Sequence, residues 1–376
     1  MDAEKPAKPE KKESSADKIK ELEDRIGKSK YNKSTQKAIG IYKAQLAKLK
    51  VKQAARASGG KKGEGFSVRK TGDGTVVLLG FPSVGKSTLL NKLTNANSAV
   101  AAYAFTTLTV IPGTLEYKHT KIQILDVPGV VHGAAAGTGR GKEVLGVIKS
   151  ADLILIIIDV FHPEHYEALK HEIYETGVRI NQHPPDIKIV KTARGGIDIG
   201  TTIRLTKIDK QTIQDVMREF KIMNAHVVIR SDIDVDQLID SLEGNKIYLP
   251  AILVVNKIDM ADAATIERLR RELKPDLFIS SEQGIGIEEL KEIVYQKLRI
   301  IRIYMKEVDK KPDLEEPLIM WQESTIRDIC RKLHKDFESK FKYAKIWGKS
   351  VRYDGQKIVK LDHHVMDQDV IEIRIS

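Results

Sequence analysis

The sequence predicts an α/β fold built on a mostly parallel sheet, because strand-like and helix-like segments alternate along much of the chain. Apolar strand-like runs occupy 75–80, 121–126, 151–160, 247–256 and 276–281, and segments of helical periodicity occupy 87–94, 142–151, 265–273 and 287–301. Alternation of this kind produces a parallel sheet with helices on both faces. Glycine-rich and acidic motifs follow the strands directly, at the carboxyl ends where such sheets bind phosphate-bearing ligands.

The first of these motifs, GFPSVGKS at residues 80–87, fits the pattern G-x-x-x-x-G-K-[ST]. A loop of this kind between a strand and a helix turns successive backbone N–H groups inward, and the helix dipole adds to the resulting anion site. We expect Lys86 to reach the outer phosphates and the Ser87 hydroxyl to bind Mg²⁺. The residues expected to contact the ligand here are Gly80, Phe81, Pro82, Ser83, Val84, Gly85, Lys86, Ser87 and Thr88.

A second strand ends in Asp126-Val127-Pro128-Gly129. An aspartate in this place suits a water-mediated Mg²⁺ contact, and the backbone N–H of Gly129 suits a terminal phosphate. The segment GAAAGTGRG at 133–141 is rich in glycine, so ordering it is costly and is expected to depend on a bound ligand.

The tetrapeptide Asn256-Lys257-Ile258-Asp259 follows another apolar strand and predicts which base is bound. The Asp259 carboxylate can accept two parallel hydrogen bonds from the ring N–H and the exocyclic amine of guanine, whereas adenine lacks this pair of donors. We expect Asn256 to bond the base edge and hold the loops together, and the Lys257 stem to cover the ring face. The motif therefore predicts a guanine nucleotide.

Two further segments bear on the base. Ser280 and Ser281 end the next strand, where a backbone N–H can meet the guanine carbonyl. Thr206-Lys207-Ile208-Asp209 is a near-copy of the base motif, but it lacks the asparagine and follows no buried strand, so we interpret it as a chance match.

The charge of the chain is concentrated at its N-terminus. The formal net charge of the 376 residues is +11, and residues 1–62 hold 18 Lys/Arg against 8 Asp/Glu. A basic segment on a nearly neutral body indicates contact with a polyanion, most simply nucleic acid, with a solvated tail as the alternative. A single cysteine, Cys330, and the lack of a signal-like apolar segment predict a cytoplasmic protein without membrane contact.

The regions outside the phosphate-binding segment have their own patterns. Apolar spacing predicts two helices, one from Ala16 and one ending near Ala57, joined by a polar turn into a basic hairpin that either enters a nucleic-acid groove or packs on the body. Residues 164–246 break the strand–helix rhythm and predict a small α+β insert. The stretch 101–117 contains the adjacent threonines Thr106 and Thr107 and a Pro-Gly pair that predicts a turn.

Residues 302–376 predict a separate β-grasp module with a helix over 325–341. Between Arg331 and Arg352 there are 8 Lys/Arg and 2 acidic residues, interleaved with aromatic residues. Basic and aromatic side chains together suit RNA backbone contact and base stacking. The alternative is that the aromatic residues belong to the core, which we favour for Trp347.

The motifs GFPSVGKSTLLNKLT, YAFTTLTVIPG, DVPG, GTGRGKEVLG, RSDIDVDQLID and NKID together resemble those of the developmentally regulated GTP-binding proteins (DRG), within the Obg-related translation-factor GTPases. The resemblance covers essentially the whole chain. It implies a basic tail and helical hairpin over 1–62, a P-loop GTPase domain over 63–301 with its insert at about 164–246, and a TGS domain over 302–376. It also implies slow GTP hydrolysis, association with ribosomes or RNA, and a role in translation.

The resemblance assigns roles to single residues as well. Lys86 and Ser87 are the phosphate and Mg²⁺ contacts, and Asp126 and Gly129 anchor the second switch. Thr107, or its neighbour Thr106, is the switch threonine that senses the terminal phosphate and joins Ser87 and Asp126 around Mg²⁺; the sequence leaves the choice open. Some related GTPases hold K⁺ with an Asn in the phosphate loop, and Ser83 stands there in this chain, so potassium dependence is also open.

The residue after Gly129 departs from Ras-like enzymes, in which a glutamine there orients the attacking water. Val130 cannot do this, so hydrolysis must depend on a partner, a cation or another group in the loop. Arg140 as a finger in cis and His132 as a water-positioning residue are two such groups, each competing with a structural or solvated role.

The sequence therefore predicts a Mg²⁺-dependent GTP-binding and GTP-hydrolysing switch that acts on ribosomes or RNA. The alternative is a GTP-gated scaffold for a regulatory protein partner, in which hydrolysis is incidental. A P-loop kinase or ATPase is disfavoured by the guanine motif at 256–259.

Overall fold

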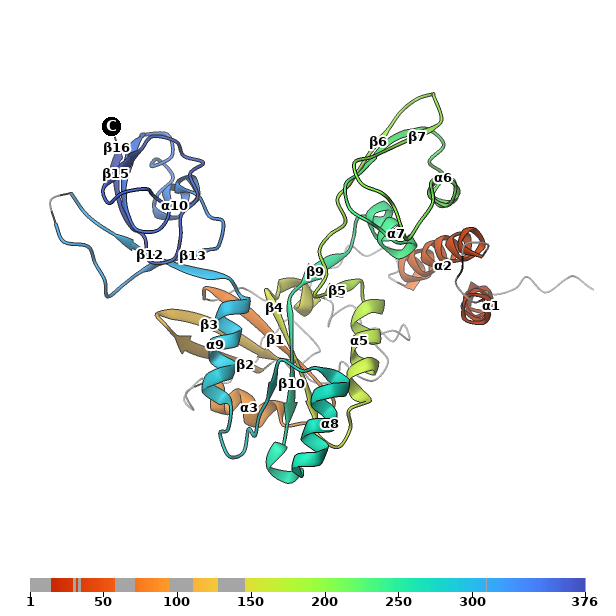
Figure 1. Ribbon diagram of the computed structural model, residues 1–376, viewed down its shortest axis with the longest axis horizontal. Coiled ribbons are helices and arrows are strands. Elements are labelled where there is room, and N and C mark those ends of the chain that lie inside the picture. The colour runs from red at the N-terminus through yellow and green to blue at the C-terminus, as the bar shows by residue number, and fades with distance from the viewer. Residues whose placement is uncertain are drawn as a thin grey trace, which may run out of the picture. The chain divides into compact units, whose positions relative to one another are not determined.

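The computed structural model describes residues 15–29, 32, 35–57, 72–94, 111–127, 146–308 and 310–375. The chain divides into two compact units, one formed by residues 1–64 with 182–248 and the other by residues 65–181 with 249–376 (Figure 1). No helix among the described residues is long and apolar enough to cross a membrane.

The larger unit contains a six-stranded sheet with the strand order β11-β10-β4-β1-β3-β2. Its strands are β1 (Gly74–Leu79), β2 (Ile111–Tyr117), β3 (Thr120–Asp126), β4 (Leu153–Asp159), β10 (Ala251–Asn256) and β11 (Leu277–Phe278). All neighbours pair in parallel except β2 and β3. Strands β1, β4 and β10 are buried along their whole length, as expected of parallel strands covered on both faces.

Helices cover this sheet on both faces (Figure 1). They are α3 (Lys86–Leu93), α5 (His165–Glu175), α8 (Ala263–Leu273) and α9 (Ile287–Lys297), with a 3₁₀ turn η1 (Ile258–Met260) after β10. Apolar side chains of α3 and α9, such as Leu89 and Leu290, pack in one core with alternate residues of β1 and β10, such as Val76 and Ile252. The predicted α/β fold with a mostly parallel sheet is confirmed.

The turn predicted at the Pro-Gly pair near the start of β2 is absent. The sequence predicts a turn at Pro112-Gly113, but both residues lie within β2, opposite Leu125 and Ile124 of β3. Proline is tolerated because β2 is the edge strand of the sheet, with no partner on its other side among the described residues. Glycine is needed because a Cβ atom at Gly113 would lie 2.5 Å from Cγ2 of Thr94.

The C-terminal part of this unit is a five-stranded sheet of order β13-β12-β16-β14-β15 with one helix. The elements are β12 (Ile300–Met305), β13 (Leu318–Trp321), α10 (Ile326–Leu333), β14 (Phe341–Trp347), β15 (Gln356–Ile358) and β16 (Val370–Ile375). Strand β12 pairs in parallel with β16 and antiparallel with β13. The predicted β-grasp module is present, with its own apolar core around Ile303, Ile329 and Ile346.

Two helices in this part of the chain end earlier than predicted. The helix expected over 325–341 ends at Leu333, because Glu338 folds back to bind Arg327 and Arg331, each at 2.6 Å. The helix expected over 287–301 ends at Lys297, and Arg299 then adopts φ of 54° before β12 begins. In both places a tertiary contact or turn overrides a continuous helical pattern.

The smaller unit contains a three-stranded sheet of order β6-β8-β7 and four helices among the residues that the structure describes. The elements are α1 (Ser15–Lys28), α2 (Gln36–Ala57), β6 (Ile187–Lys191), β7 (Ile197–Thr201), α6 (Lys210–Glu219), β8 (Ala225–Ile229) and α7 (Val235–Glu243). Outside this sheet, β5 (Val178–Ile180) pairs with β9 (Ile247–Leu249), where the chain leaves the larger unit after residue 181 and re-enters it at residue 249.

Helix α2 packs on the α+β insert and shares its core. Ala44 of α2 is fully buried in the cluster that contains Val216 of α6 and Leu238 of α7. Close approach is possible because α2 carries Gly40, where a Cβ atom would lie 3.1 Å from Cγ2 of Thr212. The sequence left open whether the basic hairpin enters a nucleic-acid groove or packs on the body. The structure shows that α2 packs on the body.

The lysines of α2 are largely neutralised where they lie. Lys37 pairs with Asp215 at 2.9 Å, Lys43 with Asp236 at 2.6 Å and Lys48 with Glu219 at 3.6 Å. Lys50 pairs with Glu23 of α1 at 3.1 Å. Much of the positive charge on α2 therefore serves to dock the helix.

Candidate functional site

The loop between β1 and α3 depends on its two glycines. Gly80 leaves β1 so close to β4 that a Cβ atom on it would lie 2.5 Å from the carbonyl oxygen of Ile157. Gly85 precedes α3 with φ of 95°, in the left-handed region, and a Cβ atom there would lie 2.4 Å from Nδ2 of Asn256. Both positions therefore require glycine, Gly80 for space and Gly85 for space and backbone conformation.

The other predicted residues of this loop divide by exposure. Pro82 and Ser83 are exposed, and Ser83 adopts φ of 64°. Val84 is buried, and Phe81 and Thr88 are half-buried. The loop is therefore held at Phe81 and Val84 and presents its tip outward.

Lys86, Ser87 and Asp126 meet at the start of α3, as the sequence predicts. Nζ of Lys86 donates to the carbonyl oxygens of Gly80 and Phe81, each at 2.9 Å, so the ammonium group lies inside the curve of the loop. Oγ of Ser87 donates to Oδ2 of Asp126 at 3.2 Å. The structure brings together the lysine that is predicted to bind phosphate and two of the predicted Mg²⁺ ligands.

The charges of Lys86 and Asp126 are only partly compensated by other groups of the protein. Burial lowers the pKa of Lys86, against the opposing effect of Asp126. Burial raises the pKa of Asp126, against the opposing effects of Lys86 and the Ser87 hydrogen bond. Desolvation is thus the larger influence on both groups. An anion beside Lys86 and a cation beside Asp126 would favour the charged forms of both groups.

The surroundings of the Asp126 carboxylate show whether a metal ion fits at this site. Its side chain is buried, and its Oδ1 atom has no hydrogen-bond partner among the described residues. A buried carboxylate oxygen without a partner is costly, and Mg²⁺ takes carboxylate and hydroxyl oxygens together with water. The donor set of Asp126 and Ser87 therefore fits Mg²⁺.

Several predicted switch residues lie outside the described part of the chain. They are Thr106, Thr107, Gly129, Val130, His132 and Arg140. Their roles remain predictions.

Asn256 joins the phosphate loop to both base-binding segments. Its Nδ2 donates to the carbonyl oxygen of Val84 at 2.8 Å. Its Oδ1 accepts from the backbone N–H of Ser281 at 2.9 Å and from the Ser281 hydroxyl at 3.0 Å. Asn256 and Ser281 are both buried, so these bonds form in a setting where an unpaired amide is costly. The loop-holding role predicted for Asn256 is confirmed.

The same contacts revise the role expected of Ser280 and Ser281. The backbone N–H of Ser280 donates to the carbonyl oxygen of Ile285 at 3.1 Å, and that of Ser281 donates to Asn256. Neither N–H group is free to meet the guanine carbonyl. The next amide, that of Glu282, has no such internal partner among the described residues. The Glu282 amide is therefore a better candidate for this contact than the amides of Ser280 and Ser281.

Asp259 lies on the exposed turn η1, directly after the strand that carries Asn256. Lys257 adopts φ of 64°, so the chain turns sharply between Asn256 and Asp259. This turn places the carboxylate at the carboxyl end of β10, beside the end of β4 and β1 in the sheet order. The base motif and the phosphate loop are thus at one edge of one sheet.

Known proteins match along nearly the whole chain. Residues 75–192 match the family described as 50S ribosome-binding GTPase, residues 194–300 the C-terminal region of that domain, and residues 301–375 the TGS domain. An uncharacterized GTP-binding protein of Methanocaldococcus jannaschii is 50% identical over 362 residues, covering 95% of this chain and 92% of the relative. Developmentally-regulated GTP-binding protein 1 of Xenopus laevis is 40% identical over 359 residues, covering 94% and 97% respectively. The chain belongs to the DRG family.

Membership of the DRG family confirms the resemblance found in the sequence and the C-terminal TGS domain. The protein is a GTP-binding GTPase with a P-loop domain. The guanine preference predicted from residues 256–259 agrees with this family.

One site residue of this DRG protein was not predicted. Asp159, at the end of β4, is buried and lies 3.4 Å from Nζ of Lys257 through its Oδ2 atom. Its Oδ1 atom accepts from the backbone N–H groups of Phe161 and His162, at 3.1 Å and 3.0 Å. Asp159 therefore fixes the Lys257 side chain that is expected to cover the base. An acidic residue at the end of a buried strand, as at Asp126, was the available signal.

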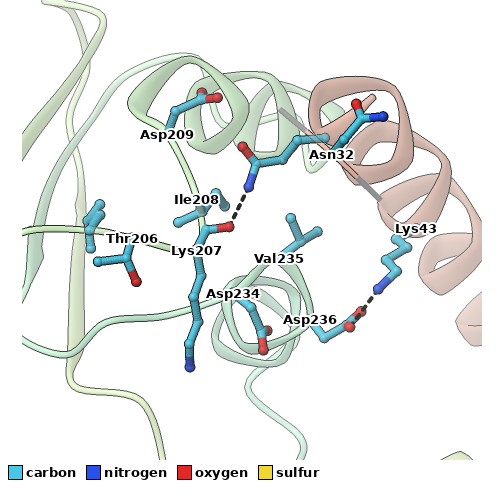
Figure 2. A pocket seen from close by; sticks show the side chains of 11 residues that line it. Asn32, Lys43, Thr206, Lys207, Ile208, Asp209, Asp234, Val235 and Asp236 are labelled. Atoms are coloured by element: carbon cyan, nitrogen blue, oxygen red, sulfur yellow. Dashed lines mark hydrogen bonds and ion pairs between the residues drawn. The ribbon is translucent and has the colours of Figure 1, made fainter. Parts of the chain in front are cut away.

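The near-copy of the base motif lies in the smaller unit, beside a cavity of about 800 Å³ (Figure 2). The Asp209 carboxylate accepts from the backbone N–H of Thr212 at 2.7 Å and so caps α6. Across the same cavity Lys43 binds Asp236 (Figure 2). The Asp209 carboxylate thus has a structural task as a helix cap, which agrees with the interpretation of residues 206–209 as a chance match.

Proposed function

We propose that this DRG-family GTPase is a Mg²⁺-dependent switch that acts on ribosomes or RNA in translation. The observation that carries the proposal is the match of residues 75–192 to a family described as ribosome-binding. Support for a switch comes from the direct hydrogen bonds of Asn256 to the phosphate loop and to the base loop. Because of these bonds, the phosphate loop and the base loop can respond together when a nucleotide is bound.

In the proposed cycle, each described site residue has one task. Lys86 binds the outer phosphates, Asp259 selects guanine, and Asn256 keeps the two loops in register. Ser87 and Asp126 hold Mg²⁺, which neutralises phosphate charge when bound. The proposal leaves the positioning of the attacking water to residues outside the described part or to a partner.

The TGS sheet offers a surface for RNA on the face that is turned away from its core. Tyr343, Lys345 and Trp347 alternate along β14 with the core residues Ala344 and Ile346, so they share the outer face. Trp347, which the sequence favoured as core, is half-buried on this face. Alternation on the strand, rather than hydrophobicity, decides its place.

Basic side chains lie directly over these aromatic rings. Nζ of Lys357 lies 4.1 Å from the centre of the Tyr343 ring, and Nζ of Lys306 lies 4.8 Å from that of Trp347. We name Tyr343, Lys345, Trp347 and Lys357 the basic–aromatic face; Lys306 lies beside it, but its charge is paired with Glu372 at 2.9 Å. Cationic groups with aromatic rings suit phosphate contact and base stacking.

The N-terminal hairpin contributes less charge to this role than its composition suggests. Lys37, Lys43, Lys48 and Lys50 are held in ion pairs with carboxylates of the protein. In the TGS domain, by contrast, Lys335, Lys342 and Arg352 are exposed, and no ion pair within 4.0 Å engages them among the described residues. The proposal therefore assigns RNA contact first to the TGS domain.

Ribosome co-sedimentation with GTP, GDP and a non-hydrolysable GTP analogue tests the proposal. We expect pelleting that depends on the nucleotide, weakens as salt is raised, and falls at least fivefold in a Tyr343→Ala, Lys357→Glu double variant. Lys170→Glu, which makes the same charge change on α5, is the control and should pellet like the parent protein. Pelleting that is absent with all three nucleotides would contradict the proposal and favour the scaffold for a regulatory protein.

A further inference from the structure

The turn that follows β4 gathers three side chains that the GTPase cycle does not use. His162, Glu164 and His165 each offer one ligand atom, and these atoms all lie within 4.8 Å of one another. Nδ1 of His162 lies 3.2 Å from Oε1 of Glu164. Two imidazoles and a carboxylate are a ligand set that Zn²⁺ and similar ions take in proteins.

The backbone of this turn is fixed independently of the three ligands. Asp159 accepts from the backbone N–H groups of Phe161 and His162. The backbone N–H of His165 then donates to the carbonyl oxygen of His162 at 3.2 Å, at the start of α5. The spacing His162-x-Glu164-His165 is therefore held by the fold, and the exposed His162 and Glu164 side chains are free to adjust around an ion.

His165 supplies a second, separate observation. Its Nδ1 atom is buried and has no hydrogen-bond partner among the described residues. The centre of the His165 ring lies 3.8 Å from that of the Phe81 ring and 4.9 Å from that of the His162 ring, and both pairs are stacked. A buried polar nitrogen without a partner is unfavourable, and binding a metal ion through Nδ1 itself would relieve that cost.

An ion pair is the simpler use of His162 and Glu164, but it explains less. Their side chains are 54% and 66% exposed, and a pair so open to solvent contributes little to stability. It also leaves the buried nitrogen of His165 unexplained. A metal ion accounts for all three residues together.

We propose that His162, Glu164 and His165 form a binding site for a divalent transition-metal ion of the Zn²⁺ type. The site differs from the Mg²⁺ site in chemistry, because Ser87 and Asp126 offer only oxygen atoms, whereas this turn offers two imidazoles. Three protein ligands leave a fourth position for water or another ligand.

The proposed site adjoins the phosphate loop through a single ring contact. His165 stacks on Phe81, and the carbonyl oxygen of Phe81 accepts from Nζ of Lys86. A metal ion that fixes the His165 ring also restricts Phe81. The site is therefore placed to adjust the loop that binds the phosphates.

Titration of the full-length, nucleotide-free protein with Zn²⁺, and with Co²⁺ as a spectroscopic probe, tests the proposal. An excess of Mg²⁺ is kept present so that the oxygen-ligand site does not contribute. We expect one ion per chain and the visible absorption of Co²⁺ bound to nitrogen ligands. Binding should weaken at least tenfold in His162→Ala and in Glu164→Gln, whose side chains are exposed and whose replacement leaves the fold intact.

His171→Ala is the matched control, because His171 is an exposed histidine on the same helix as His165. It should bind Zn²⁺ like the parent protein. Equal Zn²⁺ affinity in all three variants and the parent protein, or no one-to-one complex with the parent protein, would overturn the proposal. Since neither arm uses GTP, the outcome is independent of the proposed role in translation.

Discussion

Gly85 and Asn256 are the two residues whose contact shapes the nucleotide site. Gly85 must adopt a left-handed backbone conformation, and its α-carbon lies against the Asn256 amide. Asn256 in turn bonds Val84 and Ser281. A disturbance at Gly85 therefore reaches the base-binding loop as well as the phosphate loop.

Substitution of Gly85 by alanine is expected to lower GTP and GDP affinity by at least a hundredfold. The added Cβ atom would meet Nδ2 of Asn256 at 2.4 Å, which would displace the amide from its three bonds. The measurement is calorimetric titration with GDP. Gly195→Ala is the control, because Gly195 also has positive φ, 109°, but nothing lies within 4 Å of its added Cβ. It should cost only about 1–2 kcal/mol of stability and leave affinity unchanged; equal affinity in both variants would contradict the role of the Asn256 contact.

Asp259→Asn should change which base is bound while the fold is retained, because Asp259 is exposed. An amide N–H in place of a carboxylate oxygen faces a donor of guanine, whereas xanthine presents a carbonyl oxygen at that position. We expect GTP affinity to fall by roughly a hundredfold, for a loss of about 3 kcal/mol, and XTP affinity to rise. Competition of both nucleotides against a fluorescent GDP measures the change. Undiminished GTP binding would exclude Asp259 from base recognition.

For single residues, the sequence predicts which side chains stand at the end of a strand, but not which groups they contact. Lys86, Ser87 and Asp126 were predicted to meet because parallel strands align their carboxyl ends. The bond from Ser281 to Asn256, which takes the N–H expected for guanine, depends on the exact turn after β11 and carries no pattern of its own. Asp159 was missed because its partner, Lys257, lies in another segment.

Among the secondary-structure elements, α2 depends on one glycine for its docking. A Cβ atom at Gly40 would lie 3.1 Å from Thr212 and 3.3 Å from Val216 of α6, so Gly40→Val should separate the helices and cost about 1–3 kcal/mol. Thermal unfolding and limited proteolysis measure the effect. Gly27→Val is the control on α1, since nothing lies within 4 Å of its added Cβ. Equal melting temperatures for the two variants would show that α2 is not held through this contact.

Strand β16 carries a buried carboxylate that predicts the acid response of the TGS domain. The Lys306 hydrogen bond, aided by Arg374, holds the pKa of Glu372 below its ordinary value of 4.5, against the effect of burial. A lowered folded-state pKa stabilises the protein above pH 4.5, and this contribution is lost as pH falls through the lower folded-state value. Glu372→Gln should therefore lose about 1–3 kcal/mol at pH 7 and show a shallower decline in stability on acidification.

Denaturant unfolding between pH 7 and pH 3 measures this difference. Glu323→Gln is the control, because Glu323 is 72% exposed in its pair with Arg299. It should follow the parent protein within about 0.5 kcal/mol. A parallel pH profile for Glu372→Gln and the parent protein would show that the carboxylate does not stabilise the domain through its charge.

Local patterns predicted the elements well where burial and periodicity agree, as in β4 and α8. They failed where a contact between residues distant in sequence determines the local structure. The pair Pro112-Gly113, taken alone, predicts a turn, yet pairing with β3 makes it part of an edge strand. The helical pattern after Leu333 is interrupted by the bonds of Glu338 to Arg327 and Arg331, which no local spacing shows.

Over the whole molecule, the charge distribution suggested a basic arm separate from a neutral body, and the structure changes that picture. Helix α2 buries Ile39 and Ala44, and its lysines bind acidic residues of the insert. Helix α2 is therefore part of a folded unit, and its removal alters more than charge. Net charge alone could not predict this, because it does not show which carboxylates face which lysines.

Deletion of residues 1–57 should therefore destabilise the insert. Loss of α2 exposes the apolar surface around Val216 and Leu238, and burial of Ile39 and Ala44 alone contributes about 2–3 kcal/mol. We expect a lower melting temperature and stronger binding of a hydrophobic dye. Deletion of residues 1–14 removes none of the contacts described for α1 and α2, and should leave both readouts unchanged. If the longer deletion melts like the parent protein and binds no more dye, the segment is a dispensable arm, and its lysines are again available to a polyanion.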